Sequence, residues 1–436
     1  MSRKTAQGLA STTVMAVAIA SLAACGGATD DGATTDGGKT TLTFAYMGSA
    51  EQQEMYNKLF AEFESENPDI DLEAQAVAVN NWAEFFNKIS TQIAGGQVPD
   101  IIQVATEGQR MFASKGLLAP LDDYIAADQD VIDEYYADID PNLIEWNAQY
   151  SSPDGKTYYL PGDFNTMAMW CNTELFDQAG VTLPARGEDW SWDEFEAAAQ
   201  AVKETTGAYA YAADTGYFIG VMPWVLTNGG SSFSEDWSTP TFDTPEVVEA
   251  ATFVRSLVEQ ELAPVPGGTF DQYTAFAQDK LACFGGGRWP VINIRNLDAI
   301  EKTQIVSWPV NSGNGSPVGW NGYPIMKESE NKDAAWTFIK FLISEGGSSF
   351  FAELGGTIVP ARRSVAESES YLANSPVGTE ILYDALTYAT PIPSPDRGAE
   401  VQAVIEDAWQ QILVGNTSPE EGAAAAQAAL VPLLAE

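Results

Sequence analysis

Residues 40–104 read TTLTFAYMGSAEQQEMYNKLFAEFESENPDIDLEAQAVAVNNWAEFFNKISTQIAGGQVPDIIQV, and two kinds of periodicity alternate along them. β-Rich runs occupy residues 40–46 and 72–79, and a third begins at residue 99. Between them lie two segments with apolar side chains at helical spacing, the first ended by Asn67-Pro68 and the second by Gly95-Gly96. The apolar residues of the two faces are Tyr56, Leu59, Phe60, Phe63, Trp82, Phe85, Phe86, Ile89 and Ile93. This order of strands and helices predicts a parallel, doubly wound sheet.

The same alternation continues along the rest of the chain. Residues 158–172 and 280–294 have the composition of buried strands, and residues 191–207 form a helical pattern with a capping box at Ser191 and Glu194. Further helical patterns span residues 245–260, 331–347, 401–413 and 419–434. No linker that would detach a domain interrupts residues 40–436. We therefore predict the α/β class, with two lobes that share the chain.

The first 39 residues differ from the rest. Arg3 and Lys4 precede an apolar run, residues 9–24, which is typical of a signal peptide and too short to span a membrane. The run ends in LAAC, residues 22–25, which resembles the bacterial lipobox, where the cysteine becomes lipidated. We expect a signal peptide over residues 1–24, a membrane anchor at Cys25 and a flexible tether over residues 25–39. An ordinary cleavage site that happens to precede a cysteine is the alternative.

The chain is strongly acidic. Its 436 residues include 21 Lys and Arg against 61 Asp and Glu, a formal net charge of −40 at pH 7. Such a surface repels phosphate backbones, so nucleic-acid binding is a poor hypothesis. Hydrophobic residues make up 45% of the sequence, which argues against disorder and leaves solubility as the simplest role of the charge.

Histidine is absent from the sequence. This excludes Ser-His-Asp and Cys-His catalysis and any metal site with imidazole ligands. Apart from Cys25, only Cys171 and Cys283 remain; they could form a disulfide in an oxidising compartment or act as small buried side chains. An enzyme built from this chain would need carboxylates alone, as glycosidases do. We expect no cofactor and no metal.

Seven segments, in the same order, resemble the extracellular solute-binding proteins of ABC importers, in particular the sugar-binding group that includes the maltodextrin-binding proteins. They are IAGGQVPDIIQV, KGLLAPLDDYI, YYLPGDFNTMAMWCNTELFDQAGV, DWSWDEFEAAAQAV, LACFGGGRW, ENKDAAWTFIKFLIS and LGGTIVPARRSV. The resemblance implies two lobes joined by a hinge of crossing segments, with ligand in the cleft between them. It places the N-terminal lobe at residues 40–161 and 322–358, and the C-terminal lobe at residues 162–321 and 359–436.

The same resemblance suggests binding residues for a sugar. A sugar offers paired hydroxyls and apolar C–H faces, so its site needs carboxylates or amides and aromatic rings. Gly108 stands where the maltodextrin group carries an arginine, which argues against maltodextrin itself. The candidates are Ser49, Trp82, Glu107, Asp163, Asn165, Tyr217, Trp224, Trp289, Trp320, Asn321 and Arg362, with packing in the core or exposure on the surface as the alternative role of each.

The sequence thus predicts a monomeric, lipid-anchored, extracytoplasmic protein that binds a mono- or oligosaccharide, closes on it and delivers it to a membrane permease without catalysis. A secreted glycosidase that relies on carboxylates, an adhesive surface lipoprotein and a binding protein for a non-sugar solute are the alternatives. Product formation would indicate the glycosidase, and the absence of any small-molecule ligand would indicate the adhesive protein.

Overall fold

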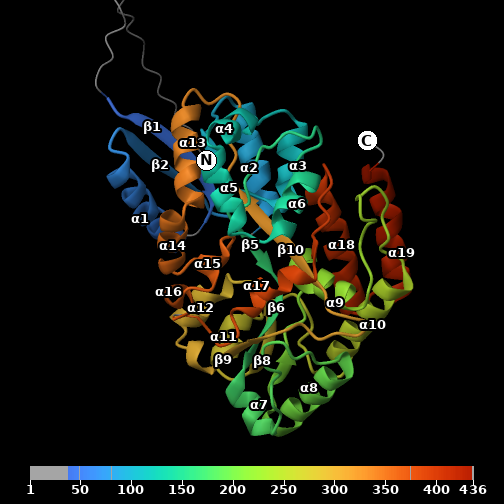
Figure 1. The fold of residues 1–436 in the computed structure, drawn as a ribbon. Helices are drawn as coiled ribbons and strands as arrows, with labels where there is room; N and C mark the ends of the chain where they lie inside the picture. Colours follow the sequence, from blue (N-terminus) through green and yellow to red (C-terminus); the bar gives the residue numbers. More distant parts are fainter. Residues whose placement is uncertain (1–37, 49, 80, 374, 435–436) are drawn as a thin grey trace, which may run out of the picture. The chain divides into compact units, whose positions relative to one another are not determined.

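A computed structural model describes residues 38–48, 50–79, 81–373 and 375–434. The chain divides into Met1–Gly38 and a compact unit, Lys39–Glu436, and the fold below is that of the second unit. The predicted signal peptide, Cys25 and Ser49 lie outside the described residues. Within this unit, β1 (Thr40–Met47) and β2 (Ile70–Val77) lie toward one end (Figure 1). Toward the other end lie β6 (Ala168–Asn172), β8 (Leu281–Gly286) and β9 (Thr303–Val306), with β5 (Asp163–Thr166) and β10 (Ser316–Gly322) between the two groups.

The first sheet is parallel, as the sequence predicts. Its order is β2-β1-β3, with β1 at Thr40–Met47, β2 at Ile70–Val77 and β3 at Ile101–Ile102. The crossover helices are α1 (Ala50–Glu66) and α2 (Trp82–Ala94). The apolar face of α1 packs on β1, where the ring of Phe44 lies 5.6 Å from that of Tyr56 and 5.7 Å from that of Phe60. Helix α13 (Lys332–Ile343) returns to this sheet from far along the chain, with Phe338 5.8 Å from Phe44.

The middle sheet is assembled from distant segments. Its order is β11-β5-β10-β12, and β4 pairs with β10. The strands are β4 (Val104–Ala105), β5 (Asp163–Thr166), β10 (Ser316–Gly322), β11 (Val359–Pro360) and β12 (Ala389–Pro391). Strand β10 runs parallel to β12 and antiparallel to β4 and β5. Residues 158–172, predicted as one buried strand, therefore supply β5 here and continue as β6 in the next sheet.

The third sheet is mixed. Its order is β7-β8-β6-β9, formed by β6 (Ala168–Asn172), β7 (Tyr209–Tyr211), β8 (Leu281–Gly286) and β9 (Thr303–Val306). Only β7 and β8 are parallel, since β6 is antiparallel to both of its neighbours. The expectation of mainly parallel sheets thus holds for the first sheet but not for this one, because β6 enters from β5 rather than through a crossover helix. A disulfide joins the register partners Cys171 and Cys283, whose sulfurs are 2.02 Å apart.

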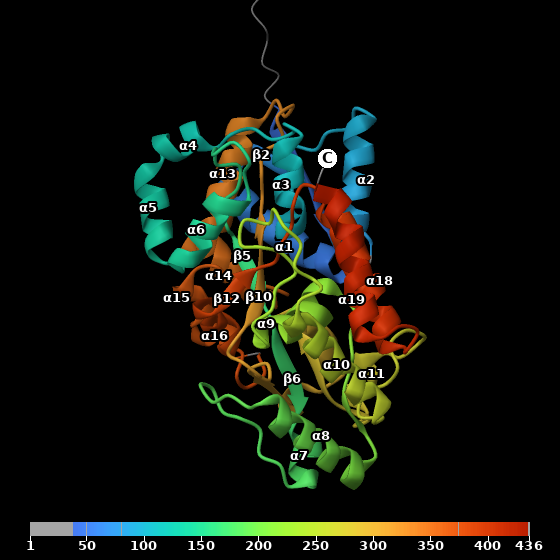
Figure 2. The same cartoon turned by 90° about the vertical axis from the view of Figure 1, so that its right-hand side faces the viewer.

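Helices surround these sheets (Figures 1 and 2). Helix α8 has the predicted capping box of Ser191 and Glu194, whereas residues 290–294, predicted as strand, begin α12 because Pro290 occupies its first turn. The helices not yet given are α3 (Thr106–Ser114), α4 (Asp122–Ala127), α5 (Gln129–Ala137), α6 (Pro141–Tyr150), α7 (Thr173–Ala179), α8 (Trp192–Thr206), α9 (Met222–Thr227), α10 (Pro245–Glu259), α11 (Gln272–Ala277), α12 (Pro290–Asn296), α14 (Glu345–Glu353), α15 (Arg363–Ala366), α16 (Glu369–Leu372), α17 (Ile381–Asp384), α18 (Gly398–Leu413) and α19 (Pro419–Leu430). A π-helical turn, η1, covers Tyr217–Val221, and 3-10 turns cover Ile300–Lys302 (η2), Ala385–Thr387 (η3) and Val431–Leu434 (η4).

Candidate functional site

A cavity of about 530 Å³ opens beside the middle sheet. This volume lies in the range of about 300–1,000 Å³ that is typical of small-molecule sites. Its lining comes from all three parts of the fold: the ends of the first sheet, β5 and β10 of the middle sheet, and the loops that follow the third sheet. The lining residues are Met47, Gln52, Asn81, Trp82, Gln103, Ala105, Glu107, Asn165, Gly216, Tyr217, Phe218, Ile219, Trp289, Gly319, Asn321, Thr357, Ile358, Gln402 and Glu406.

Aromatic rings form part of the cavity wall. Trp82 opens α2, where Asn81 caps the helix by accepting a hydrogen bond from the backbone N–H of Glu84 at 2.9 Å. Its ring stacks on that of Phe86, with the centroids 5.7 Å apart. On another side, the rings of Phe218 and Trp289 lie 6.3 Å apart. Rings held by their neighbours in this way can act as rigid platforms for the apolar face of a ligand.

The absence of a side chain at Gly287 lets both Trp289 and Asn165 approach its backbone. A Cβ atom on Gly287 would lie 2.5 Å from the Trp289 ring and 2.6 Å from Oδ1 of Asn165, closer than real Cβ contacts. The backbone N–H of Arg288 donates a hydrogen bond to this Oδ1 at 2.7 Å. Because the carbonyl end of the Asn165 amide is engaged, its Nδ2 is the donor left for a ligand.

Two other amides offer acceptors. Asn321 donates from Nδ2 to Oδ1 of Asp163, which leaves its own Oδ1 as an acceptor. Gln103, between β3 and β4, is 6% exposed, and its Oε1 is buried with no hydrogen-bond partner among the described residues. A buried acceptor of this kind is costly unless a ligand or water donates to it.

Two carboxylates complete the lining. Glu107 lies in the first turn of α3, and Glu406 lies on α18, where its Oε1 accepts the backbone N–H of Tyr217 at 2.9 Å. Burial raises the pKa of Glu107 to about 7; a hydrogen bond from Gln402 opposes this shift, and the nearby charge of Glu406 adds to it. Burial also raises the pKa of Glu406. Among the described residues that line the cavity there is no lysine or arginine.

These contacts describe a pocket whose lining combines aromatic rings, amides and carboxylates. The family model of the bacterial extracellular solute-binding proteins matches residues 48–348. The chain belongs to this family. It is 27% identical over 388 residues to a binding protein of Brucella abortus, an alignment that covers 85% of this chain and 88% of the relative.

Solved structures show the same two-lobed fold for this solute-binding protein. One is an ABC substrate-binding protein of Listeria monocytogenes in complex with cycloalternan, 25% identical, with a TM-score of 0.79 over 91% of this chain and 99% of that one. Another is the GacH receptor of Streptomyces glaucescens, solved unliganded and with acarbose; it is 26% identical, with a TM-score of 0.76 over the same shares of the two chains.

Six of the residues predicted as ligand contacts line the cavity of the solute-binding protein, so they remain candidates. Trp82 lies on α2 and Glu107 on α3. Asn165 lies on β5 and Asn321 on β10, while Tyr217 begins η1 and Trp289 precedes α12. Tyr217 is fully buried, and its hydroxyl bonds to Oγ of Ser232 at 2.5 Å, so it supports the cavity more than it reaches into it.

Three predicted contacts lie outside the lining. Trp224 is a core residue, with its Nε1 donating to the Tyr211 hydroxyl at 3.1 Å, because its ring completes a cluster with Trp192 and Trp308. Trp320 is turned to the other face of β10, where its Nε1 donates to Oδ1 of Asn147 at 3.2 Å. Asp163 is buried beneath Asn321 and also accepts from the Tyr323 hydroxyl at 2.7 Å. These three residues do not line the cavity, and their contact with a ligand stays a prediction.

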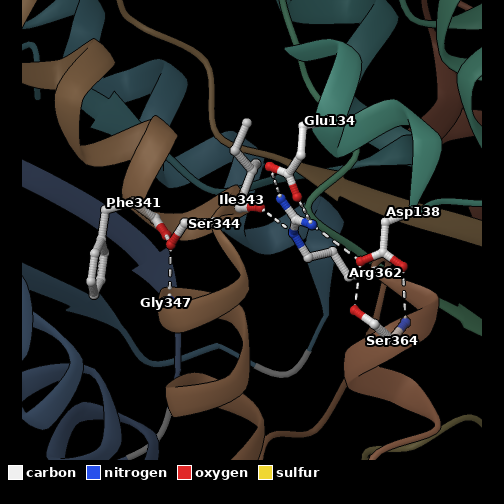
Figure 3. A network of polar contacts seen from close by, with 8 residues as sticks. All are labelled: Glu134, Asp138, Phe341, Ile343, Ser344, Gly347, Arg362 and Ser364. Atoms are coloured by element: carbon white, nitrogen blue, oxygen red, sulfur yellow. Dashed lines mark hydrogen bonds and ion pairs between the residues drawn. The ribbon is translucent and has the colours of Figure 1, made fainter. Parts of the chain in front are cut away.

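Arg362 also lies away from the cavity, in a network that joins three segments (Figure 3). Its Nε donates to the carbonyl of Ile343 at 2.7 Å, at the end of α13. Its terminal nitrogens bond both carboxylate oxygens of Glu134 at 2.9 and 3.1 Å, and Oδ2 of Asp138 at 3.1 Å. Figure 3 shows the guanidinium pointing toward Glu134 on α5 and toward Asp138 just after that helix, which gives Arg362 a structural role, while its contact with a ligand stays a prediction.

The sequence analysis missed Gln402 and Glu406. They are four residues apart on α18 and thus face the same way, beside the buried stripe that contains Val401, Ile405 and Trp409. The sequence signal that could have found them is a pair of polar side chains at helical spacing along the border of an apolar face.

The described residues contain no cluster of three or more Cys, Asp or Glu that could hold a metal ion. Within the same part of the chain, no helix has the length and apolar character needed to cross a membrane.

Proposed function

We propose that this solute-binding protein captures a mono- or oligosaccharide in the cavity, closes on it and presents it to the permease of an ABC importer. The observation that carries the proposal is the composition of the lining, in which aromatic rings stand beside amides and carboxylates and no basic side chain is present among the described residues. Rings suit the C–H faces of a sugar, and amide and carboxylate groups suit its hydroxyls. Anionic solutes would meet the carboxylates of Glu107 and Glu406 unfavourably.

The relatives support the same class of ligand. The two solved proteins described above were each crystallised with an oligosaccharide or a related compound, cycloalternan and acarbose. Gly108 stands where the maltodextrin group carries an arginine, which favours a sugar other than maltodextrin.

For closure, we assign the N-terminal lobe to residues 40–161 and 322–358 and the C-terminal lobe to residues 162–321 and 359–436. With these boundaries the lining divides between the lobes: Trp82 and Glu107 belong to the first, and Trp289 and Glu406 to the second. The strands of the middle sheet then act as the crossing segments. A ligand that touches both sides would favour the closed state by its additional contacts there.

Delivery would require the protein to stay near its permease. We assign this role to a lipid on Cys25 and to the tether of residues 25–39, with the folded unit acting as an extracytoplasmic monomer. The protein would perform no chemistry on the sugar. A glycosidase is the alternative, and it predicts products from a glycan panel.

A thermal-shift screen against mono-, di- and oligosaccharides tests the proposal. A ligand with micromolar affinity, present at millimolar concentration, stabilises the native state by about 4 kcal/mol. A clear shift with one class of sugar, and recovery of that sugar unchanged, is the expected result. A panel without shifts would point to a non-sugar solute, and released products would point to an enzyme.

A further inference from the structure

We infer, building on the proposed function, that the cavity prefers a polyhydroxylated ligand that carries a protonated amine to the neutral sugar of the same shape. An amino sugar or an aminated oligosaccharide is the chemical class. The inference rests on the acidic groups and aromatic rings that line the cavity and on the unpaired buried acceptor of Gln103, which is also a lining residue.

The charges of the lining are of one sign. Glu107 and Glu406 face the cavity from α3 and α18, and no described lining residue is a lysine or arginine. The arginines closest in sequence to lining residues, Arg110 and Arg288, do not line the cavity, although Nε and Nη1 of Arg288 are buried with no hydrogen-bond partner among the described residues. Arg110 bonds Asp396 at 3.0 Å, and Arg288 donates to Oγ of Ser375 at 2.8 Å with its guanidinium over the Tyr371 ring. Within the described part of the chain, the two carboxylates therefore have no lysine or arginine beside them in the cavity lining.

The two carboxylates also act on each other. The charge of Glu406 adds to the rise in the pKa of Glu107, and Asp214, which precedes η1, adds to that of Glu406. The other groups that face them are neutral: Gln402 beside Glu107, and the backbone N–H of Tyr217 on Glu406. Closure would remove more water from this pair. A neutral sugar can fill the lone pairs of the oxygens but cannot cancel their charge, whereas an ammonium group does both.

The rest of the lining also favours a ligand rich in donors. The buried Oε1 of Gln103 has no partner among the described residues, and Oδ1 of Asn321 remains an acceptor because its Nδ2 is bound to Asp163. The faces of aromatic rings attract cations, and Trp82, Phe218 and Trp289 surround the same space. Acceptors, negative charge and ring faces together match a cationic amine on a sugar framework.

Calorimetric titration with matched pairs of ligands tests this inference. Each pair consists of a neutral sugar and its amino counterpart, such as glucose and glucosamine, galactose and galactosamine, or an N-acetylated and a deacetylated glucosamine disaccharide. At about pH 7.5, above the pKa of Glu107, and at low salt we expect the amine to bind about tenfold more tightly in the pair that fits the cavity. Salt at about 0.5 M should reduce this ratio, although close charges are screened less than distant ones.

Two variants locate the source of the preference. Glu406→Gln keeps an oxygen to accept the N–H of Tyr217 but removes the charge. The ratio of the affinity for the amine to that for the neutral sugar should therefore fall severalfold. Glu400→Gln is the matched control, because Glu400 is exposed on the same helix and does not line the cavity. Its ratio should equal that of the wild type.

A neutral sugar that binds as tightly as its amine would overturn the inference and leave the proposed function intact. An equal loss of preference in both variants would overturn it too, because the overall charge of the protein would then be responsible. Failure of every pair to bind would count against the inference and the proposed function together.

Discussion

Oδ1 of Asn165 accepts a hydrogen bond from the backbone N–H of Arg288 at 2.7 Å, and this contact ties β5 to the loop after β8. Asn165 lies on the middle sheet, whereas Arg288 follows the third sheet, so one amide both joins two parts of the fold and lines the cavity. The contact fixes which end of the amide a ligand meets. Position 165 therefore has a structural contact and a proposed binding role, which substitution can separate.

Asn165→Ala and Asn165→Asp should separate them. Alanine leaves the N–H of Arg288 without its acceptor, so we expect a loss of about 1–3 kcal/mol in the free energy of unfolding. Aspartate keeps the acceptor and loses the donor, so the unfolding free energy should change by less than about 1 kcal/mol while the affinity for a neutral sugar falls about tenfold. Urea unfolding and calorimetry measure the two effects. Equal stability of the two variants would show that the contact does not matter.

Trp289→Ala should weaken binding of the sugar by about 1–3 kcal/mol, because it removes an aromatic platform at the border of the cavity. The fold should remain, since the ring is only half-buried. Trp224→Ala is the contrasting variant. It should lose about 3–5 kcal/mol of stability, because that ring is fully buried in an aromatic cluster. Melting temperature and sugar affinity should be measured for both variants. If Trp289→Ala binds the sugar as tightly as the wild type, Trp289 is not a platform for the ligand.

Arg362→Met should destabilise the fold by about 1–3 kcal/mol and leave the affinity for the sugar unchanged. The arginine is 2% exposed and holds α5, α13 and the start of α15 together. The expected loss is moderate, because the side chain of Glu134 is 63% exposed and can regain water. Chemical denaturation measures the loss. Glu134→Gln is the control with a smaller effect, and a weakened ligand affinity in Arg362→Met would restore a role in binding.

Asp163 should make stability depend on pH. Burial raises its pKa to about 7, against about 4 for an exposed aspartate. Between these values the folded chain holds a proton that the unfolded chain has lost, so this residue makes the protein less stable as the pH rises through the window. Its contribution changes by at most about 1.4 kcal/mol per pH unit and is constant above about pH 7.

The substitution Asp163→Asn removes this pH-dependent contribution to the free energy of unfolding. The unfolding free energy of the variant should therefore rise relative to that of the wild type as the pH increases from about 5 to about 8. Glu107 titrates in the same range, but it is present in both proteins and cancels in the comparison. Parallel pH profiles in urea unfolding experiments would mean that Asp163 is ionised throughout.

The sequence predicted most elements because their patterns are local. The apolar face of α1 and the capping box of α8 are written in consecutive residues, and both are found as expected. The middle sheet could not be predicted in the same way. Its strands come from residues as far apart as Val104 and Ala389, and β11 is only two residues long, so neither periodicity nor length reveals them.

The candidate site was predicted in part for a related reason. Trp289 and Glu107 follow recognisable segments, but a tryptophan at the surface of a cavity and one in the core have the same local sequence signal. The local sequence alone therefore does not show which of Trp224, Trp289 and Trp320 lies at the cavity. Glu406 was missed because its closeness to Glu107 depends on α18 packing beside α3, almost 300 residues away along the chain.

One titration tests most directly whether the cavity is the ligand site. The sugar selected by the thermal-shift screen is titrated into the wild type and into a double variant, Trp82→Ala with Trp289→Ala. The two rings lie on opposite lobes as assigned here, so their loss should weaken binding about 100-fold or more while the melting temperature of the unliganded protein changes little. Equal affinity in the two proteins would contradict this account and place the ligand elsewhere.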